Sequence, residues 1–260
     1  MAYASLPVRR SFGETMRRGA WWLPSLLTFI GLSAFVVYST WAAFQGDNYH
    51  FGNYLSPFYS PEIFGNSPHA MFGAKPAWIP AWVPFSPALL ILWAPAGFRF
   101  TCYYYRGAYY KAFWADPISC AVGEPRSEYR GERKFPLILQ NIHRYFLYIA
   151  LIFLIFLAYD AINAYRFTDG IHVNLGSIIL TANVFFLGGY TFSCHSLRHL
   201  IGGNCDELSK KPLQCAAYNA CSSLNKRHMI FAWCSLFVVG FSDVYVRLCA
   251  MGIWSDLRIF

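Results

Sequence analysis

Five long apolar runs separated by polar connectors dominate the chain. A bilayer core of about 30 Å takes roughly 20 helical residues, and each run approaches or exceeds that length. Because lipid offers no hydrogen-bond partners to backbone groups, we expect these runs to be helices. The sequence therefore predicts an all-α, integral membrane five-helix bundle that forms a single transmembrane domain over residues 1–260. The expected spans are approximately 21–44, 81–105, 145–165, 171–195 and 229–254.

The second run differs from the others because prolines interrupt it at Pro84, Pro87 and Pro95. Proline cannot donate a backbone hydrogen bond inside a helix, so we expect a kinked or late-starting helix there. Aromatic and basic residues continue the helical pattern past the run until Asp116 and Pro117 stop it. This predicts a helical extension over residues 103–116, which serves as an interfacial anchor or as a docking platform for a soluble partner.

Basic residues alternate strictly between the two sides of the predicted membrane. Four lie before the first span, seven between residues 106 and 144, and five between residues 198 and 227, whereas three occupy the opposite connectors and tail. Cytoplasmic connectors are rich in Lys and Arg, so the N-terminus is predicted to be cytoplasmic and the C-terminus outside. The extension at 103–116 then lies on the cytoplasmic side.

The composition supports a membrane protein: 56% of the residues are hydrophobic, 20% aromatic and 13% charged. A soluble domain carries about 25% charged residues. The net charge of +8 is divided among the connectors rather than gathered on one face or arm, which argues against nucleic-acid binding. The basic N-terminus precedes a long run without a small-residue cleavage site, so we expect a retained first helix. Most of the eight cysteines fall on the cytoplasmic side and are expected to stay reduced.

Four charged residues lie within the predicted spans, where charge is costly, and one of them, Arg99, is near the cytoplasmic end of the second span and could extend to the membrane surface. Asp160 is near the end of the third span, and Asp243 and Arg247 are four residues apart on the fifth. That spacing lets Asp243 and Arg247 neutralise each other within one helix. The alternative is a proton or quinone site, and these residues also motivate a second candidate function, a small polytopic transporter. Transporters often contain internal repeats, and none is visible here.

Cysteine and histidine side chains gather near the cytoplasmic ends of the spans. His195 and His199 are one helical turn apart beside Cys194, and His228 opens the fifth span. Thiolates and imidazoles at a membrane boundary suggest iron. We take six residues as candidate metal ligands: Cys102, Cys120, His143, Cys194, His195 and His199.

Two cofactors, or no metal at all, fit these candidates. A [2Fe–2S] cluster with Cys and His ligands needs two thiolates on one iron and two imidazoles on the other. A haem b needs two axial imidazoles at the same depth on different helices, which His143 with His195 or His199 would supply. The remaining histidines (His50, His69 and His172) fall outside, so no two histidines face each other at mid-membrane.

Four motifs resemble those of a known family. They are FRFTCYYYR at 98–106, CAVGEP at 120–125, QNIHRY at 140–145 and SCHSLRHLIGG at 193–203. They look like the five-helix, cytochrome b-like membrane anchor of succinate dehydrogenases, especially those of actinobacteria, over about residues 20–255. The resemblance implies a multi-pass protein of a bacterial plasma membrane, bound to a flavoprotein that holds FAD and to an iron–sulfur subunit. It also implies electron delivery from succinate to menaquinone.

The resemblance bears on the site as well. Anchors of this group often bind haem b inside the bundle, but mid-span ligands are missing here, which favours the Cys/His set as an iron site. Candidate quinone-binding residues are Tyr105, Arg106, Tyr110 and Trp114. The chain has no nucleotide-binding glycine motif, so we expect no dicarboxylate chemistry and no catalytic residue in this subunit. The membrane cytochrome of another respiratory complex is an alternative, and a higher oligomer stays open.

Overall fold

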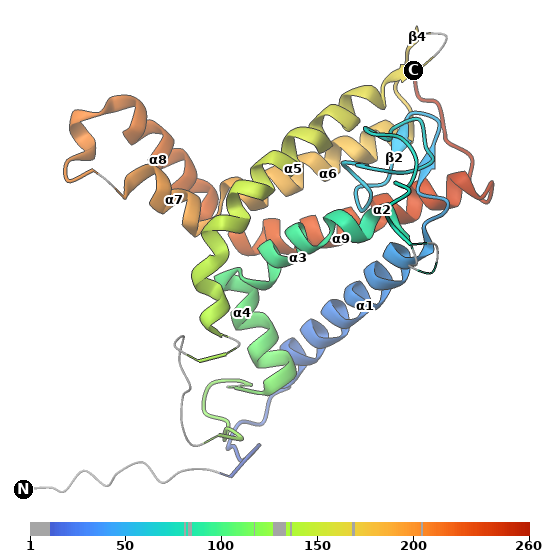
Figure 1. Ribbon diagram of the computed structural model, residues 1–260. Helices are drawn as coiled ribbons and strands as arrows, with labels where there is room; N and C mark the ends of the chain where they lie inside the picture. Colours follow the sequence, from blue (N-terminus) through green and yellow to red (C-terminus); the bar gives the residue numbers. More distant parts are fainter. Residues whose placement is uncertain are drawn as a thin grey trace, which may run out of the picture. The chain divides into compact units, whose positions relative to one another are not determined.

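A computed structural model describes most of the chain (Figure 1). It covers residues 11–80, 82, 85–116, 118–126, 134–135, 137–167, 170–203 and 205–260. The predictions that involve residues 1–10 and 127–133, including the basic residues Arg9 and Arg10, lie outside these ranges.

The described part is almost entirely helical, as predicted. Its helices are α1 (Leu23–Gln45), α2 (Pro87–Ile91), α3 (Trp93–Phe100), α4 (Tyr103–Tyr109), the π-helix η1 (Tyr110–Trp114), the 3-10 helix η2 (Leu137–Ile142), α5 (His143–Asn163), α6 (Leu175–Phe192), α7 (His195–Gly202), the 3-10 helix η3 (Leu208–Lys210), α8 (Pro212–Asn225) and α9 (His228–Ala250). Two antiparallel hairpins pair β1 (His50–Phe51) with β2 (Tyr54–Leu55) and β3 (Arg166–Phe167) with β4 (Gly170–Ile171).

Four of the predicted spans are confirmed as helices long and apolar enough to cross a bilayer. Within the described residues they are Leu23–Gln45, Ile138–Asn163, Leu175–Phe192 and His228–Ala250. Large apolar side chains on these helices remain exposed, among them Leu27, Ile155, Phe185 and Phe237. Exposed apolar surface of this kind is expected of helices that face lipid.

The second predicted span is not one helix. The helical segment starts late, at α2, where Pro87 occupies the first turn and loses no hydrogen bond by lacking an N–H. The chain is helical again in α3 and α4, and an extended Cys102 separates these two helices. The helix is therefore interrupted within the described residues 85–105, and the count of five spans and the sides of the two termini stay predictions.

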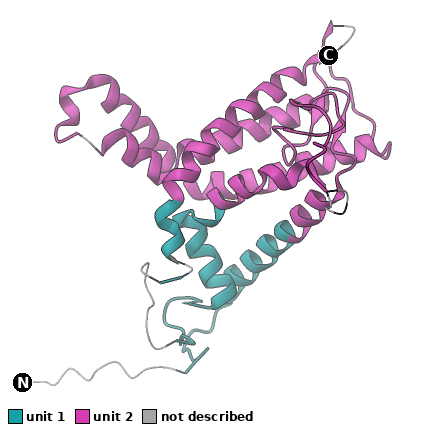
Figure 2. Ribbon diagram, in the orientation of Figure 1, with its two compact units in different colours: residues 1–36, 99–142 teal, residues 37–98, 143–260 magenta. Residues whose placement is uncertain are grey.

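The chain divides into two compact units, which Figure 2 distinguishes by colour. The first comprises residues 1–36 and 99–142. In it the segment before α1 pairs with the loop after η1. The backbone N–H of Gly13 donates to the Gly123 carbonyl, and Thr15 Oγ1 donates to the Ala121 carbonyl at 2.9 Å. Arg126 and Asp116, 2.6 Å apart, close the loop as an ion pair.

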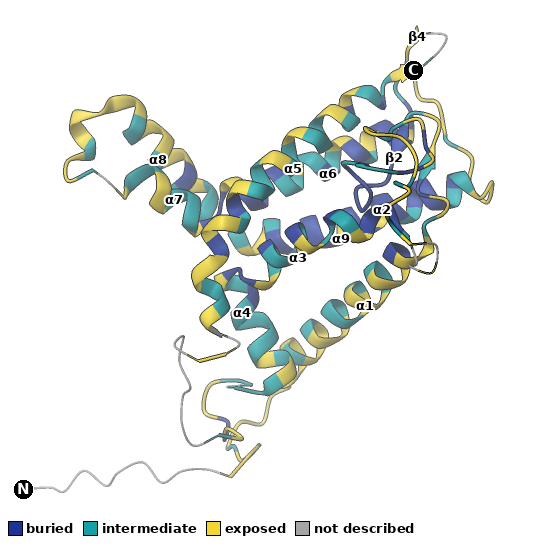
Figure 3. Ribbon diagram, in the orientation of Figure 1, coloured by how far each residue is buried: buried dark blue, intermediate teal, exposed yellow. Residues whose placement is uncertain are grey.

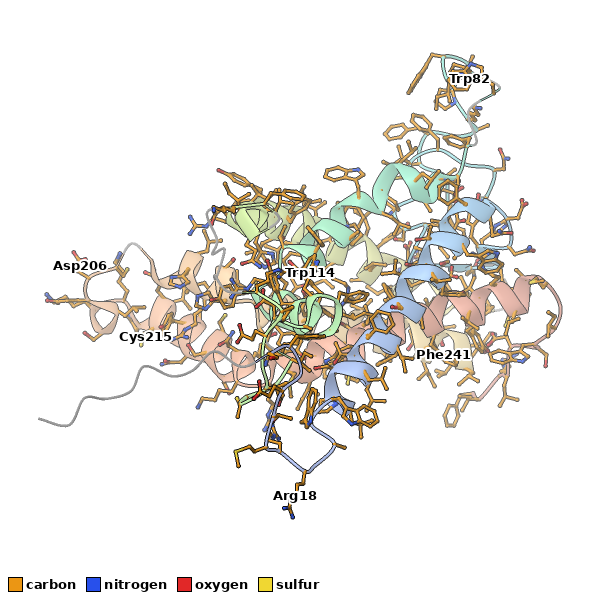
Figure 4. The ribbon with its side chains drawn as sticks, turned by 90° about the horizontal axis from the view of Figure 1, so that it is seen from below. Arg18, Trp82, Trp114, Asp206, Cys215 and Phe241 are labelled. Atoms are coloured by element: carbon orange, nitrogen blue, oxygen red, sulfur yellow. The ribbon has the colours of Figure 1, made fainter. Side chains whose placement is uncertain are left out.

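The second unit comprises residues 37–98 and 143–260. Within it α6 packs against both α5 and α9 along their length (Figure 1). α9 carries the largest set of buried residues in this bundle (Figure 3). α7 and α8 pair as a hairpin that extends beyond the bundle at the start of α9. Asp206, labelled in Figure 4, lies between these two helices in the chain.

The opposite end of this unit is closed by the loop after α1 and by the C-terminal tail. Tyr54 and Tyr59 of the loop are fully buried. The tail pairs with the segment before α6 through an isolated bridge between Asn174 and Arg258. Asp256 joins these parts, because its carboxylate accepts hydrogen bonds from Tyr54 at 2.6 Å, Asn174 at 2.7 Å and Tyr245 at 2.7 Å.

Candidate functional site

A buried histidine and a buried cysteine meet in the second unit, at the end of the bundle where α6 stops. α6 ends at Phe192, and Cys194 adopts an extended conformation (φ −64°, ψ 136°) before α7 begins. The Cys194 Sγ lies 3.2 Å from Nε2 of His143, the first residue of α5. The break between two helices therefore presents a thiol to an imidazole inside an apolar bundle.

Aromatic rings extend this pair towards a second histidine. Phe98 stacks on the His143 ring, with centroids 4.8 Å apart and an angle of 4° between planes. Tyr190 meets Phe98 edge-on at 5.4 Å and stacks on His228 at 5.1 Å. The rings thus connect an imidazole of α5 with an imidazole of α9 through continuous contacts.

The second histidine is held by the same helix break. His228 Nδ1 lies 2.6 Å from Ser193 Oγ, and Asn225 donates to the Ser193 carbonyl at 2.8 Å. The end of α6 therefore positions both imidazoles, one through Cys194 and one through Ser193. We call Phe98, His143, Tyr190, Ser193, Cys194 and His228 the histidine–cysteine cluster.

His195 and His199 form a separate pair on α7. Their Nε2 atoms are 3.0 Å apart, and both side chains are exposed. Burial lowers the pKa of His195, and the neighbouring His199 and Arg198 lower it further. The imidazoles stand one helical turn apart, and their Nε2 atoms are within hydrogen-bond distance.

The last two candidate ligands lie in the first unit. Cys102 is buried and precedes α4, whereas Cys120 is an exposed thiol in the loop after η1. All eight cysteines are free in the structure.

The candidate ligands do not assemble into a complete metal centre. Within the described residues, no three His, Cys, Asp or Glu side chains converge as ligands of one metal ion. His143 and Cys194 supply one imidazole and one thiol, which is half of the four ligands that a [2Fe–2S] cluster of this kind requires. The donor set that the structure assembles therefore does not by itself fit that cluster.

The predicted quinone residues lie on α4 and η1 of the first unit. Tyr105 is buried and its hydroxyl accepts a hydrogen bond from Arg99 at 2.8 Å. The Arg106 guanidinium lies over the Tyr103 ring, 4.0 Å from its centroid. Trp114, which is labelled in Figure 4, ends η1 and packs against Tyr110, with ring centroids 4.8 Å apart. The four residues thus share one short helical segment, in which Tyr110 and Trp114 contact each other whereas Tyr105 and Arg106 contact Arg99 and Tyr103, respectively.

Asp243 and Arg247 on α9 form an ion pair within one helix, which is one of the two interpretations given above. Arg247 Nε lies 3.3 Å from the Asp243 carboxylate, and both side chains are buried. Tyr38 donates to Asp243 at 2.5 Å, Ser56 also donates to it, and Arg247 donates to the Asp47 carbonyl at 2.7 Å. These partners satisfy the pair, so Asp243 and Arg247 no longer argue for a transporter.

Sequence reasoning left four members of the histidine–cysteine cluster out of the candidate set. His228 shared the expected depth of the others, and that depth was the signal that could have included it. Ser193 is a common residue type at the end of a helix and gave no signal of its own. Phe98 and Tyr190 gave none either, because an aromatic residue in an apolar run is indistinguishable from a lipid-facing one before the packing is known.

These features define a class: a multi-helix membrane protein with a buried histidine–cysteine cluster at one end of its bundle. Its sequence matches the family model described as actinobacterial succinate dehydrogenase subunit SdhC over residues 23–252. Its structure is similar to a chain of the Mycobacterium smegmatis Sdh1 complex in the apo form, with a TM-score of 0.87 and 44% identity over 98% of each chain. No curated protein sequence matches it.

The chain therefore belongs to the actinobacterial succinate dehydrogenase subunit SdhC family. It is a multi-pass membrane subunit of a bacterial enzyme complex, in agreement with the resemblance carried by its four motifs.

Proposed function

We propose that this chain anchors a succinate dehydrogenase in the plasma membrane and passes electrons to menaquinone. Family membership and the likeness to a chain of the M. smegmatis Sdh1 complex support this proposal. Like that chain, it assembles into a complex, here with a flavoprotein that holds FAD and an iron–sulfur subunit. The reduction consumes two electrons from the iron–sulfur subunit and two protons, and converts the quinone to the quinol.

The histidine–cysteine cluster is the observation that carries the electron-transfer part of the proposal. It places His143 and Cys194, both buried and in contact, where an apolar bundle ends. Buried polar groups are costly unless paired, and here they are neutral groups that can bind metal or hold a proton rather than a structural ion pair. Such chemistry is unnecessary for an inert anchor.

The identity of a resident redox group stays a prediction between a [2Fe–2S] cluster and haem b. Because no three of the six candidate ligands converge on one point among the described residues, we route no step through either group. Iron and sulfide analysis with electron paramagnetic resonance of the reduced complex distinguishes the two. A pure haem optical spectrum would contradict the cluster.

Quinone binding is assigned to the segment formed by α4 and η1. The Arg106 guanidinium can donate to a quinone carbonyl, and Tyr110 with Trp114 provides an aromatic wall. Tyr105 is the remaining candidate hydroxyl near this position. A pocket with one apolar wall and a few polar groups is typical of such ligands. Arg106→Ala is expected to lower quinone kcat/KM by roughly 10-fold or more, the loss of one charge-assisted hydrogen bond, with succinate oxidation by a soluble dye unchanged.

The decisive experiment compares two buried thiols of the same unit in the purified complex. Cys194 and Cys249 are each 2% exposed. Cys194 contacts His143, whereas Cys249 lies near the C-terminal end of α9, away from the histidine–cysteine cluster. We expect Cys194→Ser to lower succinate:menaquinone reductase activity by at least about tenfold, equivalent to about 1.4 kcal/mol. Cys249→Ser should retain most of the activity, because it removes a thiol outside the cluster.

A second matched pair tests the imidazole. His143→Ala is expected to reduce quinone reduction strongly, whereas His172→Ala, which removes a histidine from the other end of the unit, is expected to have little effect. Succinate-dependent reduction of a soluble dye reports whether the partner subunits remain bound and active. Full quinone reduction in both Cys194→Ser and His143→Ala would refute the assignment of the electron path to this cluster.

A further inference from the structure

A cavity in the second unit has the composition of a binding site for an amphiphile with a positively charged head. Its volume is about 460 Å³, within the usual range of small-molecule sites. Its lining residues come from the loop that carries β1 and β2 and continues after them, and from the C-terminal part of α5. Its walls are largely apolar, and its polar lining residues are Glu62, His69, Tyr159 and Asp160.

The mouth of the cavity lies on a lipid-facing stripe of α5. Ile152, Ile155, Tyr159 and Ile162 recur at helical spacing on one face and are exposed. Ile155 and Tyr159, which are 69% and 61% exposed, also line the cavity. An acyl chain that lies along this stripe would therefore place its headgroup beside the polar lining residues.

The position along α5 sets the depth of the polar groups. Asp160 is in the last turn of the candidate span Ile138–Asn163. The end of a spanning helix lies at the boundary between hydrocarbon and headgroups. The polar part of the cavity therefore sits at the level of lipid headgroups, and its apolar mouth sits at the level of acyl chains.

Charge decides the kind of headgroup. The Asp243 carboxylate forms an ion pair with the Arg247 guanidinium, whereas Glu62 and Asp160 accept hydrogen bonds from hydroxyl groups. Glu62, which is 1% exposed, accepts from the Tyr49 hydroxyl at 2.7 Å and from Ser67, and Asp160 accepts from Ser60. Among the described residues that line the cavity there is no Lys or Arg; its histidine, His69, interacts electrostatically with Asp160, and the His69 Nε2 lies 3.2 Å from the Gly52 carbonyl oxygen.

We propose that this cavity binds the primary ammonium headgroup of an aminophospholipid, with Asp160 and Glu62 as the carboxylates that attract it and one acyl chain along the α5 stripe. An ammonium group supplies both a positive charge and N–H donors for carboxylate oxygens. A phosphate or other anionic headgroup without an amine would be repelled. The inference does not depend on the succinate dehydrogenase function.

The experiment uses the full-length protein within its purified complex, delipidated and reconstituted in nanodiscs that contain phosphatidylethanolamine, phosphatidylcholine and phosphatidylglycerol in equal amounts. Lipid retained after transfer to detergent is quantified by native mass spectrometry. We expect phosphatidylethanolamine to be retained at least about tenfold over each of the other two, as one charge-assisted hydrogen bond allows.

Two variants and one control locate the effect. Asp160→Asn removes a carboxylate charge from the cavity, and Ile155→Trp narrows its mouth without changing charge, so both should abolish the preference. Asp206→Asn removes one negative charge from the exposed α7–α8 connection and should leave the preference intact. Equal retention of the three lipids by the unmodified protein, a preference that survives both cavity variants, or retention of a quinol in place of phospholipid would overturn the proposal.

Discussion

The two ends of α9 bury polar groups in opposite ways. Near its start, His228 and Ser193 belong to the histidine–cysteine cluster, whose members form neutral contacts through thiol, hydroxyl and ring atoms. Towards its other end, Asp243 and Arg247 form a buried ion pair that further hydrogen bonds surround. One helix therefore carries a cluster able to bind metal or protons at one end and a fully compensated charge pair at the other.

The difference indicates which buried polar groups in this bundle stabilise the fold and which are available for chemistry. A buried charge is retained only when its partners satisfy it, and Asp243 has hydroxyl and guanidinium donors on several sides. Imidazole and thiol can stay neutral when buried, so they remain available for ligand or proton exchange. Changes at the charged end should therefore affect folding, whereas changes in the cluster should affect activity first.

The largest expected effect on stability is at the ion pair. Arg247→Leu leaves the Asp243 carboxylate buried without its counter-charge, and breaking such a pair typically costs about 3–5 kcal/mol. We expect a lower unfolding midpoint and a lower yield of assembled complex, measured by thermal unfolding in detergent and by co-purification of the partner subunits.

The double variant Asp243→Leu/Arg247→Leu is the control for that prediction. It removes both charges, so it should be much less destabilising than Arg247→Leu alone. If the double variant is as unstable as the single one, the apolar packing of the Arg247 side chain, rather than the charge, explains its effect.

An intermediate effect is expected from the same glycine change at two positions along α6. A Cβ at Gly176 would lie 2.5 Å from the Tyr54 ring, and a Cβ at Gly189 would lie 2.3 Å from the Phe231 ring. Tyr54 is held by its hydrogen bond to Asp256, whereas Phe231 is a partly exposed apolar ring that can rotate outward.

Gly176→Ala is therefore expected to destabilise by about 1–3 kcal/mol, the usual cost of overpacking, and Gly189→Ala by less. Thermal unfolding of the two variants under one condition measures the difference. Equal losses would mean that the hydrogen bonds of Asp256 do not make its end of the bundle more rigid than the end that carries the histidine–cysteine cluster.

Hydropathy predicted the helices that depend on length and composition alone. α1, α5, α6 and α9 are long runs with few or no charges, and their ends were placed within a few residues. The interruption at Cys102 was not predicted, because the residues around it are compatible with a continuous helix. The break at Cys194 was not predicted for the same reason, since the apolar pattern indicates a helix through residue 195.

The site was predictable in its residue types and depth but not in its pairing. His143 and Cys194 were both proposed as ligands from their places near helix ends, and the structure brings them into contact. The aromatic connection through Phe98 and Tyr190 depends on which faces of α3 and α6 pack inward, and the nearly uniform apolar sequence of α6 does not encode a face. His195 and His199 came out as a separate exposed pair because α7 is a new helix with its own direction.

The smallest expected effect is on the pH dependence of stability, through the Asp256 carboxyl. Asp256 lies at the same end of the second unit as the Asp243–Arg247 ion pair. Burial raises the pKa of the Asp256 carboxyl, but hydrogen bonds from Tyr54, Asn174 and Tyr245 outweigh it, so the pKa lies below its ordinary value. A carboxyl with a lowered folded-state pKa contributes stability above its unfolded pKa of about 3.9, and that contribution is lost as pH falls through the folded-state pKa. We therefore expect the unfolding midpoint of the protein to drop below about pH 4 more steeply than that of Asp256→Asn. If the unfolding midpoints of the two proteins fall in parallel between neutral pH and pH 3, the negative charge of Asp256 is not needed to hold the tail, the loop and α6 together. The neutral amide of the variant would then hold them equally well.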